Sequence, residues 1–335
     1  MIKYLGSKRK IIDYIYKTVS EYSNSGVILD LFSGTSRVSY ALKALGHPII
    51  ANDHNTYAYN VAKCYIEGNT SHIKQAQRLI NELNSLKGSA GWFTQNYGTL
   101  SRYIQPHNCA RIDAIREEIE RKDLEPVMRS IILTALIEAA DRVDSTVGLQ
   151  MAYLKSWSKR SYNDLELRVP ALIDGHPYCL ATQQDADICA SNYEADVIYL
   201  DPPYNQHSYL GNYHIWESLV LWDKPDVYGI ARKRVDCKTR KSEFNSKRKC
   251  YNALQKVVEN STFNTLVMSY NNEGHMTIDH ITTLLDGFGE VSFVEIDHKR
   301  HICSKIGVFN KDGVRVGESG KTQNKEYLII CKREH

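Results

Sequence analysis

The stretch GVILDLFSGTSRVSYALKALGHPIIAND, residues 26–53, decides the expected fold. Residues 26–32 are an apolar, β-branched run that predicts a strand, and SGTS after them predicts a tight turn. The apolar residues that follow recur at helical spacing, and Gly46 is typical of a helix C-cap. Residues 47–53 then predict a second strand that ends in an acid. Strand, turn, helix and strand in this order indicate a parallel α/β sheet.

Further strands are expected on the far side of a long helical stretch. From about residue 60 to 175 the periodicity is mainly helical, most clearly at 110–122 and at 126–143, where Pro126 suits a first helical turn. Strand patterns return at 177–185, 195–204, 264–270, 290–297 and 326–332. The sequence therefore predicts a Rossmann-like α/β fold, with a mostly parallel twisted sheet, helices on both faces and a mainly helical insertion.

Composition places the chain among soluble globular enzymes. It has 335 residues, of which 42% are hydrophobic and 24% charged, and no apolar run approaches the length of a membrane span. The start, MIKYLGSKRKII, lacks the apolar core of a signal peptide, so a cytoplasmic location is expected. The eight cysteines form no CxxC pair, so we expect reduced thiols and no disulfide.

No metal site is expected. The best candidate is HKRHIC, which holds His298, His301 and Cys303 close together, but a fourth ligand at zinc spacing is absent.

The net charge is only +3, although one segment of the chain is strongly basic. Between Arg232 and Lys249 the chain carries nine Lys or Arg residues and two acids. Such a run favours a polyanionic partner. A solvated or disordered basic loop explains the composition equally well.

Two motifs are expected at the carboxyl edge of the sheet, where doubly wound folds bind their ligands. In the first, Gly34 lets the backbone approach a ligand, and Asp53 is placed to accept hydrogen bonds from a ribose diol. The turn has one glycine rather than three, so it is not a dinucleotide fingerprint. Taken alone, a tight packing turn also explains it.

The second motif is DPPY, residues 201–204, directly after the apolar run VIYL. The two prolines fix the chain, so that the Asp201 carboxylate and the Pro202 carbonyl become rigid acceptors with Tyr204 beside them. Such a site accepts the hydrogens of an exocyclic amine and holds the base in one plane. A proline-stiffened turn is the structural alternative.

Four stretches in one order resemble a known family. KYLGSKRK at 3–10, DLFSGTS at 30–36, DPPY at 201–204 and MSYNNEG at 268–274 resemble the motifs of DNA adenine-N6 methyltransferases that use S-adenosylmethionine. The closest resemblance is to the Dam-like, alpha-group enzymes of restriction-modification systems. It implies a Rossmann-like methyltransferase fold, in which a target-recognition region lies between the cofactor half and the catalytic half.

The resemblance also implies roles for single residues. It assigns the methionine end of the cofactor to Tyr4, Gly6 and Lys8, the ribose to Asp53, the adenine of the cofactor to Asp185, and further lining of the pocket to Asp30, Phe32 and Gly34. It assigns methyl transfer to Asp201, Pro202, Pro203 and Tyr204. One departure concerns Ser36, which stands where the family usually has a second glycine.

The expected domains follow from the motif order. Residues 1–60 and 176–335 form the discontinuous catalytic domain, 61–175 the helical insertion and candidate target-recognition region, and 227–250 a basic loop that contacts DNA. The candidate DNA-binding residues combine cations with one aromatic: Arg142, Lys155, Trp157, Lys159, Arg160, Arg232, Lys233, Arg234, Lys238, Arg240 and Lys241. For residues 141–162, a surface loop whose Trp157 packs on the core is the alternative.

An aromatic segment follows the DPPY motif. Tyr209, Tyr213, His214 and Trp216 suit either the surroundings of an extruded base or a buried helix. We expect core packing for Trp216, because Ile215, Trp216 and their neighbours form an apolar helical stripe.

The expected function is transfer of a methyl group from S-adenosylmethionine to N6 of an adenine flipped out of duplex DNA. Double-stranded DNA is the expected partner, any restriction endonuclease would be a separate protein, and neither a membrane nor a metal is expected. The alternatives are a methyltransferase for an exocyclic amine of RNA and an inactive DNA-binding module. The complete DPPY motif argues against the inactive module, and the absence of serine at position 201 argues against cytosine-N4 methylation.

Overall fold

The computed structural model describes residues 2–6, 8–23, 25–299, 308–309, 315–317 and 323–333. Its main strands are β1 (Ile28–Asp30), β2 (Ile49–Asn52), β3 (Leu180–Thr182), β4 (Glu194–Leu200), β7 (Thr262–Asn271), β8 (Glu290–Lys299) and β11 (Gln323–Lys332). Two small pairs are β5 (Val227–Tyr228) with β6 (Lys233–Arg234), and β9 (Val308–Phe309) with β10 (Arg315–Gly317).

The helices lie before or between these strands, and four of them, α3 to α6, fall between β2 and β3. They are α1 (Ile12–Tyr22), α2 (Arg37–Ala44), α3 (Thr56–Ala62), α4 (Ile73–Asn84), α5 (Pro106–Arg121), α6 (Pro126–Val143), α7 (Ala186–Asn192), α8 (Tyr209–Asn212), α9 (His214–Leu221), α10 (Cys250–Asn260) and α11 (Ile278–Asp286). Short helical turns are η1 (Lys8–Lys10), η2 (Lys63–Glu67), η3 (Thr70–His72), η4 (Thr94–Thr99), η5 (Lys159–Tyr162), η6 (Val235–Lys238) and η7 (Glu243–Asn245).

The sheet has the order β3-β2-β1-β4-β7-β11-β8. Its strands are parallel from β3 to β7, whereas β11 runs antiparallel to both of its neighbours. The expected Rossmann-like fold with a mostly parallel sheet is confirmed. The strand order reverses between β1 and β4, so the carboxyl ends of these two strands flank the crevice where such sheets bind ligands.

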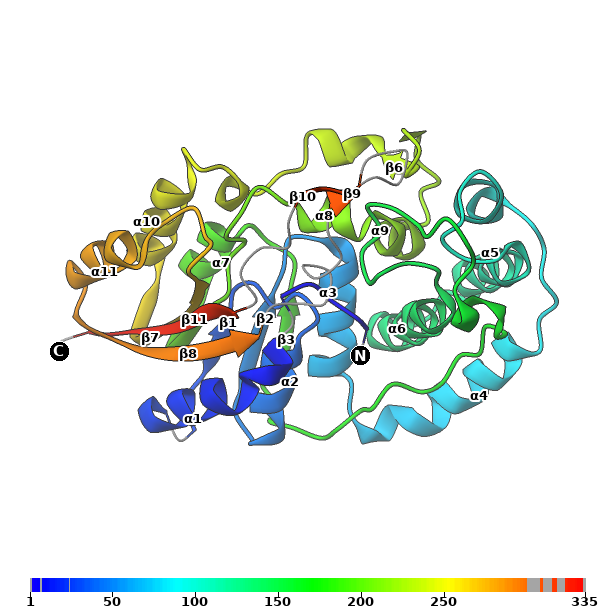
Figure 1. Cartoon of the computed structure of the whole chain (residues 1–335). Helices are drawn as coiled ribbons and strands as arrows, with labels where there is room; N and C mark the ends of the chain where they lie inside the picture. The colour runs from blue at the N-terminus through cyan, green and yellow to red at the C-terminus, as the bar shows by residue number, and fades with distance from the viewer. Residues whose placement is uncertain are drawn as a thin grey trace.

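Two apolar cores cover the two faces of the sheet. In β1, Ile28 packs with α1 and α2 on one face, while Leu29 packs with α7, α10 and α11 on the other. Figure 1 shows these two helical layers on opposite sides of the sheet. A strand that is covered on both faces buries the side chains on both of its sides. The consecutive residues Ile28 and Leu29 of β1 are therefore both apolar.

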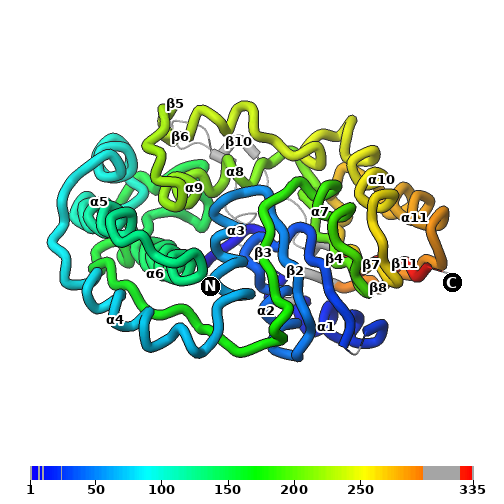
Figure 2. The backbone as a smooth tube through the Cα atoms, turned by 180° about the vertical axis from the view of Figure 1, so that it is seen from behind, coloured from blue at the N-terminus to red at the C-terminus, as the bar shows by residue number. Residues whose placement is uncertain are grey.

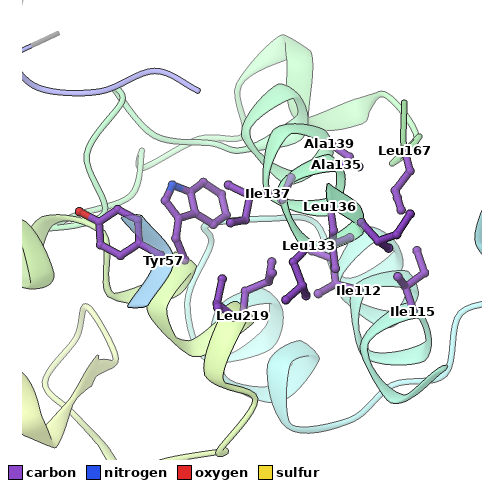
Figure 3. Packing of buried hydrophobic residues seen from close by; sticks show 14 of the residues in the cluster. Tyr57, Ile112, Ile115, Leu133, Ala135, Leu136, Ile137, Ala139, Leu167 and Leu219 are labelled. Carbon is purple, nitrogen blue, oxygen red and sulfur yellow. The ribbon is translucent and has the colours of Figure 1, made fainter. Parts of the chain in front are cut away.

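A third core lies in the helical part of the chain. It joins α4, α5 and α6 with α3 and α9, and Figure 3 shows Tyr57, Ile112, Leu133 and Leu219 meeting there from four helices. Figure 2 shows α9 beside α5 and α6, far from strands β7 and β8. The segment that follows DPPY thus supplies a helix to the core of the helical part. Trp216, at 2% exposure, lies in this core as predicted.

Local signals read from the sequence also hold. Pro126 is the first residue of α6, and Gly46 follows α2 with a φ of +91°. Ser36 has a φ of +55°, in the left-handed region that glycine adopts at least cost, which is a physical reason for a glycine to be usual at that position. In the described part of the chain no helix is both long and apolar enough to cross a membrane.

Candidate active site

A cavity of about 370 Å³ lies at the carboxyl ends of β1, β2 and β4. Ten of the residues predicted to bind cofactor or catalyse transfer line it: Tyr4, Gly6, Lys8, Asp30, Phe32, Gly34, Asp53, Asp185, Asp201 and Pro203. These residues come from parts of the chain up to 199 positions apart, and the fold brings them to one place. Pro202 is buried and Tyr204 half-buried beside the cavity, and neither lines it.

The turn after β1 shapes one wall. Gly34 has a φ of +52°, its N–H donates to Asp53 Oδ2 at 3.1 Å, and a Cβ on it would lie 3.2 Å from a ring carbon of Tyr4. Asp53 Oδ1 accepts from the backbone and side chain of Asn55 at 2.9 and 3.1 Å. The turn therefore exposes backbone to the cavity and fixes the Asp53 carboxylate at its edge.

Asp30 ends β1 at 1% exposure. Ser39 Oγ donates to its Oδ2 at 2.6 Å, while Oδ1 has no hydrogen-bond partner. Burial raises the pKa of this carboxyl group to about 7. An unpaired buried oxygen at the wall of a cavity is a site for a donor from a ligand.

Three tyrosines form a stack at the N-terminal side of the cavity. The ring of Tyr4 is nearly parallel to those of Tyr209 and Tyr213, at centroid distances of 5.3 and 4.5 Å. The Tyr4 and Tyr57 hydroxyls share a hydrogen bond of 2.8 Å, and Leu5 N donates to the Tyr213 hydroxyl at 2.6 Å. Tyr209 lines the cavity, whereas Tyr213 is buried behind it. His214 is also buried, and its pKa is lowered by burial to about 3.

Lys8 holds the carboxylate of Asp201. Its Nζ lies 3.0 Å from Asp201 Oδ1 and also pairs with Glu326, and its side chain is 7% exposed. Burial lowers the pKa of Lys8, but the charges of Asp201 and Glu326 outweigh that effect and raise it. Burial raises the pKa of Asp201 to about 6, Lys8 works against this rise, and Glu326 adds to it.

Glu326 was not predicted as a site residue. It lies in β11 and reaches the site only because that strand lies beside β7. The sequence KEYLIICK predicts the strand but gives no sign of what its acid touches.

The candidate DNA-binding residues separate into exposed and internally bonded groups. Lys155, Lys159, Lys238 and Lys241 are exposed, and Trp157 is half-buried. Arg234 is 3% exposed, pairs through two nitrogens with Asp223 at 2.7 Å each, and also contacts Asp236. The structure thus gives Arg234, which was predicted to contact DNA, an internal role, because no free surface remains for a phosphate.

The other predicted arginines bond within the chain yet keep some exposure. Arg240 pairs with Asp236 and with Glu217, which is fully buried and also accepts hydrogen bonds from the first turn of α3. Arg160 pairs with Asp144, Arg142 donates to the Glu166 carbonyl, and Arg232 donates to Asn96. The basic segment 232–249 is therefore anchored to the fold, and Lys241 with its neighbours to Asn245 lines the cavity.

No cluster of three potential metal-binding side chains occurs among the residues that the structure describes. Of the HKRHIC candidate, His301 and Cys303 lie outside the described residues.

Comparison with known proteins agrees with this geometry. The sequence profile of the D12 class N6 adenine-specific DNA methyltransferases matches residues 4–284. The chain is 30% identical to the type II methyltransferase M.NlaIII of Neisseria lactamica, over 91% of this chain and 93% of that protein. It is also 30% identical to the modification methylase StsI of Streptococcus sanguinis and to M.FokI of Planomicrobium okeanokoites, over 88% and 86% of this chain.

The chain spans about half the length of the StsI and FokI methylases, at 48% and 47%, and almost the full length of M.NlaIII. The profile match includes the cavity and the DPPY motif, and it extends over most of the sequence. This chain belongs to the D12 class of N6 adenine-specific DNA methyltransferases.

Proposed function

We propose that the chain binds S-adenosylmethionine in the cavity at the carboxyl ends of β1, β2 and β4, and methylates N6 of an adenine flipped out of duplex DNA. Use of this cofactor is general in the methyltransferase family. The observation that carries the proposal is that the Asp201 carboxylate opens into the same cavity as Gly34 and Asp53. The turn that holds Gly34 and the DPPY motif therefore border the same cavity.

The residues present fit such a cofactor. Gly34 and Gly6 both have positive φ and line the cavity, and a Cβ on either would crowd a tyrosine, Tyr4 at 3.2 Å or Tyr209 at 2.9 Å. The unpaired Oδ1 of Asp30 offers an acceptor for a ligand donor. We assign the ribose hydroxyls to Asp53 and the adenine of the cofactor to the rim, where Asp185 is 71% exposed.

When bound, S-adenosylmethionine supplies an electrophilic methyl group on a sulfonium sulfur. Asp201 and the Pro202 carbonyl accept the two N6 hydrogens of the target adenine, and Tyr204 packs against its ring. The N6 lone pair would form the new N–C bond with the cofactor's methyl group, the C–S bond would break with its electrons going to sulfur, and one N6 proton would pass to Asp201. Alignment by fixed acceptors supplies most of the acceleration.

Duplex DNA is held, in this proposal, by exposed lysines of residues 141–162, within the helical part, and of the segment 232–249. Lys155, Lys159, Lys238 and Lys241 supply phosphate contacts. Extrusion of the adenine costs a few kcal/mol, which these contacts offset. A separate restriction endonuclease as functional partner and a cytoplasmic location remain predictions.

The test is methyl transfer from labelled S-adenosylmethionine to DNA that lacks adenine methylation. The DNA is digested to nucleosides, and wild type is compared with Asp201→Ala and with Asp164→Ala, a matched loss of an acid that is 86% exposed. Wild type and Asp164→Ala should form N6-methyladenine, while Asp201→Ala loses at least about a hundred-fold in rate. In a parallel reaction that offers RNA in place of DNA, label found only in RNA would support the RNA alternative, and DNA binding without transfer to either nucleic acid would support the inactive module.

A further inference from the structure

Glu326 is a buried acid that lies outside the matched residues 4–284 and yet belongs to the site. It is 6% exposed in β11, the antiparallel strand between β7 and β8. Its Oε1 receives hydrogen bonds from Lys8 and from Ser269 Oγ at 3.2 Å, and its Oε2 one from Asn271 Nδ2 at 3.4 Å. The carboxylate is therefore held by donors from two elements.

Lys8 stands between two carboxylates. Its Nζ contacts Asp201 on one side and Glu326 on the other, and all three side chains are largely removed from water. Two acids that share one ammonium group divide its charge and its hydrogens between them. If either acid is removed, the buried Lys8 ammonium group is paired with the remaining acid alone.

We propose that Glu326 is a positioning residue for methyl transfer. It pairs with Lys8, so that Lys8 does not pair with Asp201 alone. Because Lys8 divides its charge between two acids, it neutralises the Asp201 carboxylate only in part. Asp201 therefore remains a strong acceptor for the amino hydrogens of the adenine. Without Glu326, Lys8 turns fully to Asp201 and weakens it as an acceptor. This inference rests on the proposed function, because it assumes that Asp201 receives the adenine N6 group.

Lys8 and Glu326 also affect where the proton released by the reaction goes. N6 releases one proton after attack, and Asp201 is the nearest proposed acceptor for it. The negative charge of Glu326 favours the protonated form of Asp201, while Lys8 opposes it. Among the residues that the structure describes, the other titratable groups that interact with Asp201 are three tyrosines and one acid: Tyr199, Tyr204, Tyr209 and Asp30.

The experiment compares the pH profiles of Glu326→Gln, wild type and a control. Glutamine keeps the size of the side chain and removes its charge. Glu295→Gln is the matched control, since Glu295 lies on the neighbouring strand β8 in an exposed pair with Lys325. The rate of methyl transfer to duplex DNA at saturating substrates, the KM for DNA and the dissociation constant for S-adenosylmethionine are measured from pH 5 to 9.

Glu326→Gln should lower kcat at neutral pH by about ten-fold. The acid limb of its profile should move to lower pH by about one unit, because removal of the negative charge lowers the pKa of Asp201. Its KM for DNA should stay within about two-fold of wild type, since Glu326 does not line the cavity. Glu295→Gln should match wild type throughout.

Glu326→Asp serves if the glutamine variant fails to fold. It keeps the charge on a shorter stem, so kcat should fall less than in Glu326→Gln and the acid limb should stay near that of wild type.

An unchanged acid limb and kcat in a folded Glu326→Gln would overturn the inference and leave the proposed function intact. A lower unfolding temperature without a shift in the limb would reduce Glu326 to a structural ion pair, which also overturns it. If wild type transferred no methyl group to DNA, the proposed function would fail first and this inference with it.

Discussion

Gly34 is the residue at which backbone shape and cofactor binding meet. Its positive φ closes the turn after β1, and its missing side chain leaves room beside Tyr4. Gly46 has a positive φ as well, but nothing lies within 4 Å of where its Cβ would stand. The two glycines therefore share the backbone strain of a substitution and differ only in its effect on the cavity.

Gly34→Ala should lower the affinity for S-adenosylmethionine, because the added methyl group pushes Tyr4 out of place. Gly46→Ala should destabilise the fold to a similar extent, by about 1–2 kcal/mol, and leave the affinity unchanged. Calorimetric titration and thermal unfolding of both variants measure the two effects. Equal affinity in the two variants would remove Gly34 from the binding wall.

Asp201 makes the fold less stable at neutral pH. Its pKa is raised by burial from 3.8 to about 6, so the folded chain holds this proton more tightly than the unfolded chain does. The contribution of the group to stability is therefore complete below pH 4 and is lost as the pH rises through about 6.

In the Asp201→Asn variant the side chain at position 201 cannot ionise, and Lys8 stays paired with Glu326. We expect its unfolding free energy to exceed that of wild type by about 1–3 kcal/mol at pH 7, with no difference at pH 4. Chemical denaturation at both pH values tests this. A variant that is less stable than wild type at pH 7 would mean that the Lys8 pair outweighs the burial of the charge.

Among the elements, the sequence predicted each main strand and the two longest helices, although the predicted ends of several, such as 177–185 for β3 and 110–122 for α5, differ by three or four residues. The predicted helix 126–143 coincides with α6, and the predicted strand 195–204 contains most of β4. Local periodicity carries this information because it reports which faces are buried. It does not report which strands pair, so the position of β11 beside β7, and with it Glu326, was not predictable.

The basic segment shows the same limit for charges. In the sequence Arg234, Lys238 and Lys241 are equivalent cations, whereas in the fold the arginine is buried against Asp223 and the two lysines are exposed. Partners that lie elsewhere in the chain decide which cations remain free for DNA.

The pair Lys238→Ala and Lys241→Ala should weaken DNA binding and make it less dependent on salt. The slope of log affinity against log salt should fall by about 1–2 if each lysine neutralises one phosphate. Lys74→Ala with Lys87→Ala removes the same charge from the helical part outside the predicted contacts, and should change the slope little. Fluorescence titration of a labelled duplex at several salt concentrations gives the slopes, and equal slopes for the two pairs would place the DNA elsewhere.

For the whole molecule, the third core joins the helical part to α3 and α9, which lie on either side of it in the sequence. Leu219 in α9 is fully buried in that core, and Glu217 in the same helix receives hydrogen bonds from the first turn of α3, next to Asp53. The proposed insertion at 61–175 therefore shares its core with elements on both sides of it. We infer that the two parts unfold together.

Leu219→Ala should destabilise the entire chain by about 2–5 kcal/mol, because it opens a cavity in the shared core. A single thermal transition should shift to lower temperature, and S-adenosylmethionine should raise it in the variant as in wild type. Two separate transitions, of which only the one unaffected by Leu219→Ala responds to the cofactor, would show instead that the helical part is an independent domain.

The place of β11 in the sheet has a consequence for the synthesis of the chain. This strand comes later in the sequence than both β7 and β8, yet it lies between them. While the ribosome is still adding residues before 323, β8 has no partner and Lys8 lacks one of its two acids. The nascent chain thus exposes the edge of β7 until β11 emerges, and the ion pair of Lys8 with Glu326 forms only after β11 is inserted.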